Sequence, residues 1–172
     1  MIENDVRLQL KKRFYHIKNR CYRNSNYQGV SICDSFSTSE KFYLWAKEQI
    51  GFDSFDDNGK TWQIDKDICG DGSVYSPEVC VFVPAVLNSF YYDSVEYTQD
   101  TGVSIRNNKF VVRTRKKGVR VEICRTESKD IAIKAYQDFK IDYLMELSDR
   151  YYNQVDSRIF PKLLLKITNS FG

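Results

Sequence analysis

The sequence lacks the features that mark membrane, secreted and disulfide-stabilised proteins. None of its 172 residues form an apolar run of about eighteen, so no segment is predicted to cross a membrane. The start of the chain, from Met1 to Asp5, lacks the basic-then-apolar order of a signal peptide. The five cysteines are an odd number without paired spacing, which fits a reducing compartment better than a disulfide framework. We therefore expect a soluble protein of the cytoplasm.

Acidic residues are almost missing from residues 101–125, where eight Lys or Arg residues meet a single acid, Glu122. The segment carries a net charge of +7 in a chain whose total is +3. Charge this concentrated indicates a surface for a polyanion.

The same segment has the alternation of three short strands, at 102–106, 109–115 and 119–125, joined by turns at 107–108 and 116–118. Successive side chains point to opposite faces of a strand. The apolar face is predicted to carry Val103, Ile105, Phe110, Val112, Val119, Val121 and Ile123. The opposite, largely cationic face is predicted to carry Ser104, Arg106, Lys109, Val111, Arg113, Arg115, Arg120 and Glu122.

A long helix is predicted after the third strand, with Ser128 as its N-cap and Asp130 in its first turn. Apolar residues recur there at steps of three and four, at Ala132, Ala135, Tyr136, Phe139, Tyr143 and Leu147. The apolar stripe of this helix and the apolar face of the sheet can bury each other. We therefore expect an α+β fold with a three-stranded antiparallel sheet backed by one helix and an exposed arginine face.

The segments 102–103, 109–112 and 132–139, with the basic hairpin, resemble the plant Apetala-two (ethylene response factor) DNA-binding domain, which also occurs in phage endonucleases. That family lays its sheet into the DNA major groove. The resemblance implies that bases or phosphates of double-stranded DNA are contacted by Arg106, Arg113, Arg115 and Arg120. The basic block adds Lys109, Lys116 and Lys117 to the candidate DNA-binding residues.

A second motif lies upstream: a strand at 62–68, a loop rich in Gly and Asp, a turn at Ser76-Pro77, a second strand ending at Pro84 and a helix containing Asn88. This order resembles the phage HNH homing endonucleases, which often carry an Apetala-two module behind the nuclease module. The resemblance implies a divalent metal site at Asp65 and Asn88. Oxygen ligands suit Mg²⁺ or Mn²⁺.

The catalytic base of the HNH pattern is a histidine, and this chain has Lys66 at that position beside Asp65. An ordinary lysine has a pKa of about 10.4, so at neutral pH it cannot accept a proton. Lys66 can instead hold a phosphate. The only histidine, His16, falls on a distant basic helix and is interpreted as structural or DNA-facing. The enzyme hypothesis therefore stays open between an active HNH nuclease and a degenerate site that still binds DNA.

Two further helices are predicted near the start of the chain, at 5–21 and 39–49. The first has an apolar face formed by Val6, Leu10, Phe14, Ile17 and Cys21. Basic residues lie elsewhere around it, at Arg7, Lys11, Lys12, Lys18 and Arg20. The apolar residues are expected in a core, and a DNA-backbone role for the bases stays open.

Three other features of the sequence have alternative interpretations. Cys21, Cys33, Cys69 and Cys80 are candidate zinc ligands, but no C-x-x-C pair occurs, so buried thiols are expected instead. Tyr91 and Tyr92 are candidates for an interface with a host protein or for a core. The apolar tail at 159–167 can pack on the body or mediate dimerisation, so the oligomeric state stays open.

The sequence as a whole predicts two modules with a boundary between residues 95 and 96. Residues 1–95 are expected to form an HNH-like module, possibly degenerate, and residues 96–172 an Apetala-two-like module with a helical tail. The predicted function is binding of double-stranded DNA in the cytoplasm of a bacteriophage host, with weak or absent cleavage.

Overall fold

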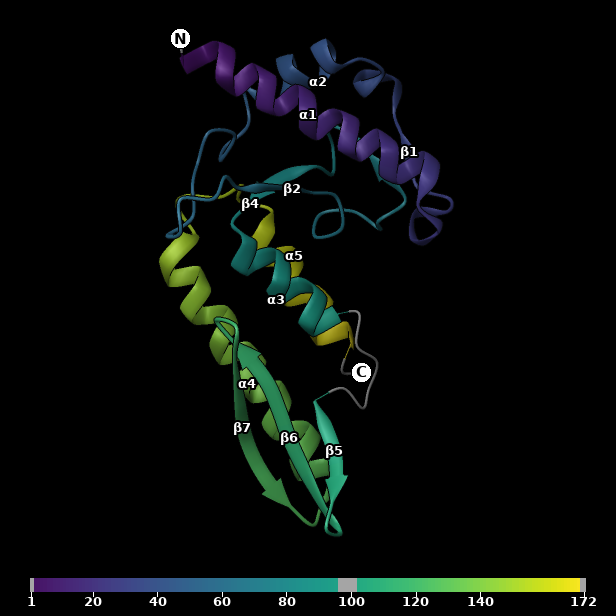
Figure 1. The fold of residues 1–172 in the computed structure, drawn as a ribbon. Coiled ribbons are helices and arrows are strands. Elements are labelled where there is room, and N and C mark those ends of the chain that lie inside the picture. The colour runs from purple at the N-terminus through teal and green to yellow at the C-terminus, as the bar shows by residue number, and fades with distance from the viewer. Residues whose placement is uncertain (1, 96–101, 171–172) are drawn as a thin grey trace. The chain divides into compact units, whose positions relative to one another are not determined.

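The computed structural model describes residues 2–95 and 102–170 (Figure 1). Helices and strands mix in an α+β fold, which confirms the predicted class. The chain forms two compact units, one of residues 1–85 with 154–156 and one of residues 86–153 with 157–172. The predicted module boundary adjoins residue 96, which lies outside the described residues, as does Thr101 at the start of the basic segment.

The first unit combines helices with short strands. Its elements are α1 (Ile2–Arg23), η1 (Ser25–Tyr27), β1 (Ser31–Ile32), η2 (Asp34–Phe36), α2 (Ser39–Ala46), β2 (Gln63–Asp65), β3 (Val74–Tyr75) and β4 (Val81–Val83). Thr38 caps α2 by accepting the N–H of Lys41 at 3.2 Å. Strands β2 and β4 lie within the two strands predicted for the second motif and pair antiparallel, whereas the parallel pairing of β1 with β3 was not predicted.

Aromatic side chains fill the core of this unit. Phe42 lies within ring-contact distance of Phe14 from α1 and of Phe36 from η2, with centroids 5.8 and 5.2 Å apart. Trp45 contacts Phe36 at 4.7 Å and lies nearly parallel to Phe82 of β4 at 6.0 Å. The predicted amphipathic helices are therefore anchored by large rings, which remove much apolar area from water per residue.

The second unit contains the predicted sheet and long helix. Its elements are α3 (Ala85–Val95), β5 (Val103–Arg106), β6 (Lys109–Lys116), β7 (Val119–Thr126), α4 (Lys129–Tyr151) and α5 (Ile159–Ser170). Strands β5, β6 and β7 are antiparallel neighbours in chain order. Ser128 caps α4 by accepting the N–H of Ile131 at 3.4 Å, as predicted. The tail forms α5, whose Ile159, Leu163 and Ile167 are buried.

Both hairpin turns of the sheet have two residues with positive φ. Asn107 and Asn108 have φ of 50° and 58°, and Lys117 and Gly118 have 51° and 80°. Positive φ at both central residues is the property of the type I′ turn, whose twist suits antiparallel strands. The first predicted turn is confirmed, and the second is one residue shorter than predicted because Lys116 still belongs to β6.

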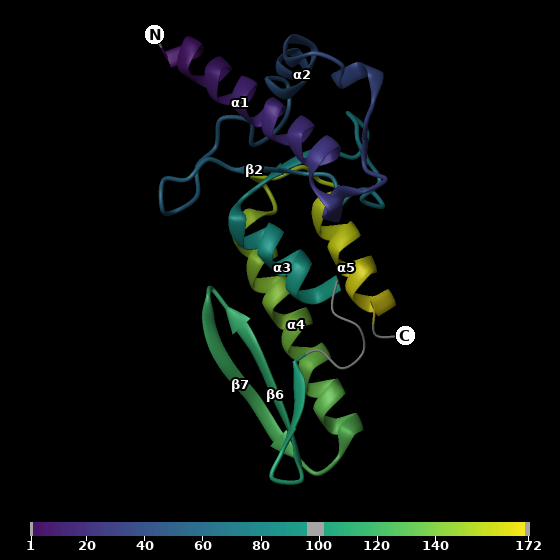
Figure 2. The ribbon, with the colours of Figure 1, turned by 45° about the vertical axis from the view of Figure 1, so that its right-hand side comes forward.

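One face of the sheet lies against α4, as Figures 1 and 2 show. Val112 and Ala132 are fully buried at this contact and Tyr136 is nearly so. Val103, Phe110, Ile123 and Cys124 pack around them. Because the helix covers this face, the side chains of the other face point away from α4.

Lys140 of α4 lies in the core of the second unit with 1% of its surface exposed. Its Nζ lies over the rings of Phe90 and Tyr136, 5.3 and 5.4 Å from their centroids. Burial, opposed by the nearby Asp93 carboxylate, lowers the pKa of Lys140 from 10.5 to about 8. A buried ammonium contacted by ring faces is held at a cost to stability.

Replacing Lys140 with Met is therefore expected to stabilise the protein at pH 7, by about 1–3 kcal/mol. Between about pH 8 and pH 10.5, Lys140 is protonated in the unfolded chain and deprotonated in the folded chain. The free energy of unfolding of the wild type therefore increases as the pH rises through this window. The advantage of Lys140→Met should shrink across that window. Urea unfolding of both proteins at pH 7 and pH 10 measures this, and a variant less stable than wild type at pH 7 would contradict it.

Candidate nucleic-acid interface

The register of the sheet determines which side chains share the face that points away from α4. Arg115 lies directly opposite Arg120, Arg113 opposite Glu122, and Arg106 opposite Lys109. Cross-strand partners point to the same side of a sheet. The predicted grouping of these six residues on one face is therefore confirmed.

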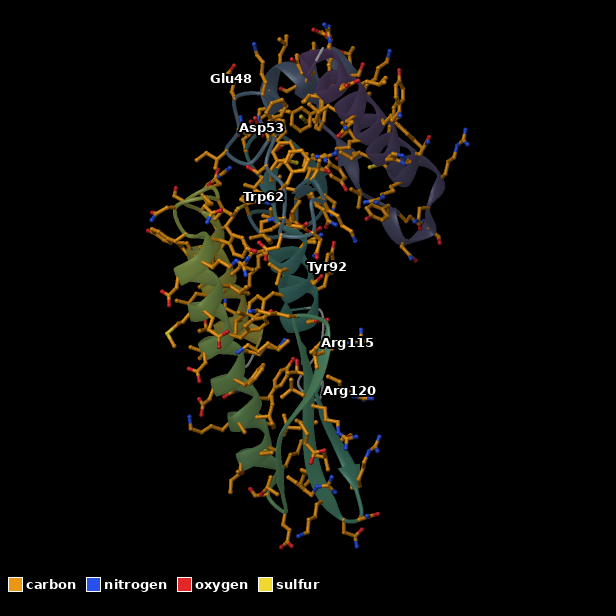
Figure 3. The ribbon with its side chains drawn as sticks, turned by 60° about the vertical axis from the view of Figure 1, so that its left-hand side comes forward. Glu48, Asp53, Trp62, Tyr92, Arg115 and Arg120 are labelled. Atoms are coloured by element: carbon orange, nitrogen blue, oxygen red, sulfur yellow. The ribbon has the colours of Figure 1, made fainter. Side chains whose placement is uncertain are left out.

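Three arginines of this face have no acidic partner among the residues that the structure describes. Arg106, Arg115 and Arg120 are exposed and make no ion pair with residues 2–95 or 102–170. Figure 3 shows that Arg115 and Arg120 both extend away from α4. Like charges that lie directly opposite across strands destabilise a sheet. An external anion near Arg115 and Arg120 would reduce this repulsion, so the pair is a candidate anion-binding site.

Glu122 is shared by two other arginines of the same face. Arg113 donates to it from Nε at 3.0 Å and from a terminal nitrogen at 2.7 Å, and Arg125 approaches it at 3.2 Å. The hydrogen bond from Arg113, assisted by Arg125, lowers the pKa of Glu122. Arg113 is therefore partly neutralised within the protein and is a weaker candidate for phosphate contact than the sequence predicted.

A β-bulge brings Arg125 onto this face. Strict alternation along β7 would place Arg125 on the apolar side with Ile123. The register instead shifts between Val112 and Arg113 of β6, so that Cys124 pairs with Val112 and Arg125 with Val111. An extra residue in one strand reverses the alternation beyond it. Sequence patterning missed Arg125 because nothing in the composition of β7 marks the bulge.

The three lysines of the predicted set lie in different surroundings. Lys109 is exposed and lies 3.4 Å from Glu127. Lys116 is on the α4 side of the sheet, where it pairs with Glu146 and lies over the ring of Tyr143. Lys116 thus joins the sheet to the helix and lies off the arginine-bearing face, and its role in DNA binding stays a prediction.

Lys117 occupies the hairpin turn, where its side chain is exposed and its N–H donates to the hydroxyl of Tyr143 at 3.3 Å. It remains a candidate for contact with an anion at the tip of the hairpin. Val111, by contrast, shares a face with Arg113 and is fully buried. The exposed cations of this face therefore lie toward its two ends, with Arg115 and Arg120 at one end and Arg106 and Lys109 at the other, rather than evenly over it.

Asp65 ends β2 with 3% of its surface exposed and stabilises the turn that follows. Its Oδ1 accepts the N–H groups of Asp67 at 2.9 Å and of Ile68 at 2.7 Å. Burial, opposed most strongly by the Ile68 hydrogen bond, raises the pKa of Asp65 to about 6. These contacts give Asp65 a structural role, and its role as a metal ligand stays a prediction.

Lys66 is enclosed by side chains of the first unit. Its Nζ lies 2.6 Å from Oδ1 of Asp67 and over the rings of Tyr27 and Tyr75, at 5.7 and 5.4 Å from their centroids. Only 6% of the residue is exposed. A lysine held in this way stabilises the loop after β2, which argues against both a catalytic base and a phosphate contact at this position.

The predicted metal pair is divided between the two units, because Asp65 belongs to the first and Asn88, half-buried on α3, to the second. Within residues 2–95 and 102–170, no three His, Cys, Asp or Glu side chains are grouped to hold a metal ion. The Mg²⁺ or Mn²⁺ site therefore stays a prediction from the resemblance.

The tyrosines considered for a host-protein interface are adjacent on α3. Tyr91 is buried, and its ring contacts that of Tyr92 at 5.5 Å and lies 5.1 Å from Nζ of Lys166. Tyr91 is therefore a core residue of the second unit, with little of its surface exposed.

Comparison with known proteins adds no relative: the sequence matches no protein-family model, and no curated protein or solved structure is similar to it. The described part of the chain has no helix of the length and apolarity needed to cross a membrane.

The turn role of Asp65 can be separated from a role that needs its charge. Because its folded-state pKa of about 6 lies above the ordinary 3.8, the fold holds a proton that the unfolded chain has released, and stability falls as the pH rises through this window. Asp65→Asn keeps an oxygen acceptor and removes the charge. We expect it to exceed wild type by about 1–3 kcal/mol at pH 7 and to match wild type below about pH 4.

The contrasting variant is Asp65→Ala, which leaves two buried N–H groups without their acceptor. It is expected to lose about 1–3 kcal/mol for each group at pH 4. At pH 7 the loss relative to wild type is expected to be smaller, because Asp65→Ala also removes the buried charge that destabilises the wild-type fold. Urea unfolding at pH 4 and pH 7 measures both variants. If Asp65→Asn destabilises the protein as much as Asp65→Ala at pH 7, the carboxylate has a role beyond the turn.

Proposed function

We propose that this protein binds double-stranded DNA through the face of the β5–β6–β7 sheet that points away from α4. In this proposal the chain is of the phage homing-endonuclease type, with an Apetala-two-like module that works on DNA in the cytoplasm of a host cell. Cleavage by an HNH-like module is weak or absent, because Lys66 replaces the expected histidine and is engaged with Asp67.

The observation that carries the proposal is the cross-strand pair of Arg115 and Arg120, with no acid beside it in the described ranges. A fold selected for stability alone gains from an acid at one of these two positions. The pair is instead retained on an exposed surface, and planar guanidinium groups match phosphate groups as bidentate partners.

The β6–β7 hairpin also has a size that suits the major groove of DNA. A two-stranded β-ribbon fits the major groove of B-DNA, and β6 and β7 form such a ribbon of eight residues each. Arginine can contact guanine edges through two donors, so Arg115, Arg120 and Arg106 can read bases as well as phosphates. Arg113 and Arg125, held by Glu122, are better suited to fixing the shape of this surface.

Arg120→Glu distinguishes a binding role from a structural one because fold stability and DNA affinity are expected to change in opposite directions. The change places an acid opposite Arg115, so the hairpin is expected to gain about 0.2–1 kcal/mol of stability. DNA binding is expected to weaken by about 1–3 kcal/mol. The measurements are thermal unfolding and fluorescence-anisotropy titration of duplex DNA at several salt concentrations.

The matched control is Lys134→Glu, which makes the same change of charge on the exposed surface of α4, away from the sheet face. It should leave DNA affinity close to wild type. Equal affinity of Arg120→Glu and wild type, at all salt concentrations, would refute the proposed surface.

A further inference from the structure

Helix α1 has a second cationic surface that the first unit does not use in its own packing. Its buried face contains Leu10, Phe14 and Ile17, which lie in the core. On the opposite side Leu8, Tyr15 and Tyr22 recur every seven residues, about two helical turns, and are 52%, 49% and 74% exposed. Apolar and aromatic side chains on the solvent face of a helix point to an interaction surface.

Lysines lie on both sides of the row formed by Leu8, Tyr15 and Tyr22. At 3.6 residues per turn, Lys11 and Lys18 lie along one edge of Leu8, Tyr15 and Tyr22, and Lys12 lies along the other. All three lysines are exposed, and none forms an ion pair with a residue in the described ranges. The sequence from Val6 to Arg23 contains no acid.

The ordinary structural explanations account for other cations of α1 but not for these three. Arg7 pairs with Glu40, and Arg13 donates to the backbone oxygen of Trp62 at 2.9 Å. Arg20 and Arg23 lie in the last turn, where positive charge stabilises the helix dipole. Lys11, Lys12 and Lys18 lie in the middle of the helix, where the dipole gives no such advantage.

We propose that this face of α1, formed by Leu8, Lys11, Lys12, Tyr15, Lys18 and Tyr22, is a second contact surface for the phosphate backbone of duplex DNA. Lysine ammonium and tyrosine hydroxyl groups both donate to phosphate oxygens, and such contacts position a protein without reading sequence. The inference rests on the proposed function of the sheet and extends it to the first unit.

Other occupants of this face fit its chemistry less well. A second copy of the helix would bring rows of lysines together, and like charges repel. A membrane surface attracts lysines, but one leucine and two tyrosines supply little apolar area for insertion into lipid. Duplex DNA requires only the charge and the hydroxyl donors. Because both units belong to one chain, the second contact with DNA would be intramolecular, and the overall affinity could exceed that of either unit alone.

The test compares two charge-matched triple variants of the full chain. Lys11→Glu/Lys12→Glu/Lys18→Glu changes the α1 face, and Lys41→Glu/Lys47→Glu/Lys60→Glu makes the same change of charge on exposed residues elsewhere in the first unit. Duplex DNA affinity is measured against salt concentration. The log of the affinity falls with the log of the salt concentration, and each lost phosphate contact makes this negative slope shallower by about 0.9. For the α1 variant alone, the slope is therefore expected to become shallower by about 2.7.

A third variant, Lys11→Arg/Lys12→Arg/Lys18→Arg, keeps the charge and is expected to bind like wild type. Equal melting temperatures of all variants confirm that folding is unchanged; if the Glu triple is unfolded, Lys11→Gln/Lys12→Gln/Lys18→Gln replaces it. If the α1 and control variants have the same salt slope, this inference is overturned while the sheet proposal stands.

The remaining outcomes separate the two proposals further. Absence of salt-dependent DNA binding by wild type would overturn both. Binding of wild type to phosphatidylserine vesicles that the α1 variant loses, with DNA affinity unchanged, would assign the face to an anionic membrane surface and also overturn the inference.

Discussion

The contact between α4 and one face of the β5–β6–β7 sheet determines the rest of the second unit. Val112 and Ala132 are fully buried there, and Tyr136 closes the contact beside them. Successive side chains of a strand point to opposite faces of the sheet. When one set is buried against the helix, the alternate set therefore points to the other face. The exposed arginines are thus a consequence of burial on the opposite face, and they need no contact of their own to hold them there.

The elements of this unit could be predicted because their signals are local. Alternation predicted three strands, the asparagine pair predicted the first turn, and Ser128 predicted the start of α4. The position of Arg125 could not be predicted in the same way, because it depends on a bulge that leaves no mark in composition. The side of Lys116 follows from alternation once β6 extends through this residue, but its partner Glu146, thirty residues away in sequence, could not be predicted.

The candidate site of the first unit was predicted by resemblance, and the contacts of its residues depend on distant segments. The two strands that become β2 and β4 were predicted from the sequence, but the enclosure of Lys66 requires Tyr27 and Tyr75, which come from separate parts of the unit. Sequence patterning predicted a strand over residues 62–68, with Asp65 inside it, whereas β2 ends at Asp65. Patterning could not show that the next turn uses Oδ1 of Asp65 as an acceptor, because that depends on backbone geometry.

The cations of the protein fall into two energetic groups. Arg113, Lys116 and Arg7 are paired with Glu122, Glu146 and Glu40, so their charges are compensated within the fold. Arg115 and Arg120 have no such partner in the described ranges, and their mutual repulsion opposes folding. In the proposed complex, phosphates bound between Arg115 and Arg120 would relieve this repulsion, and part of the favourable free energy of binding would then come from strain that the unbound fold already carries.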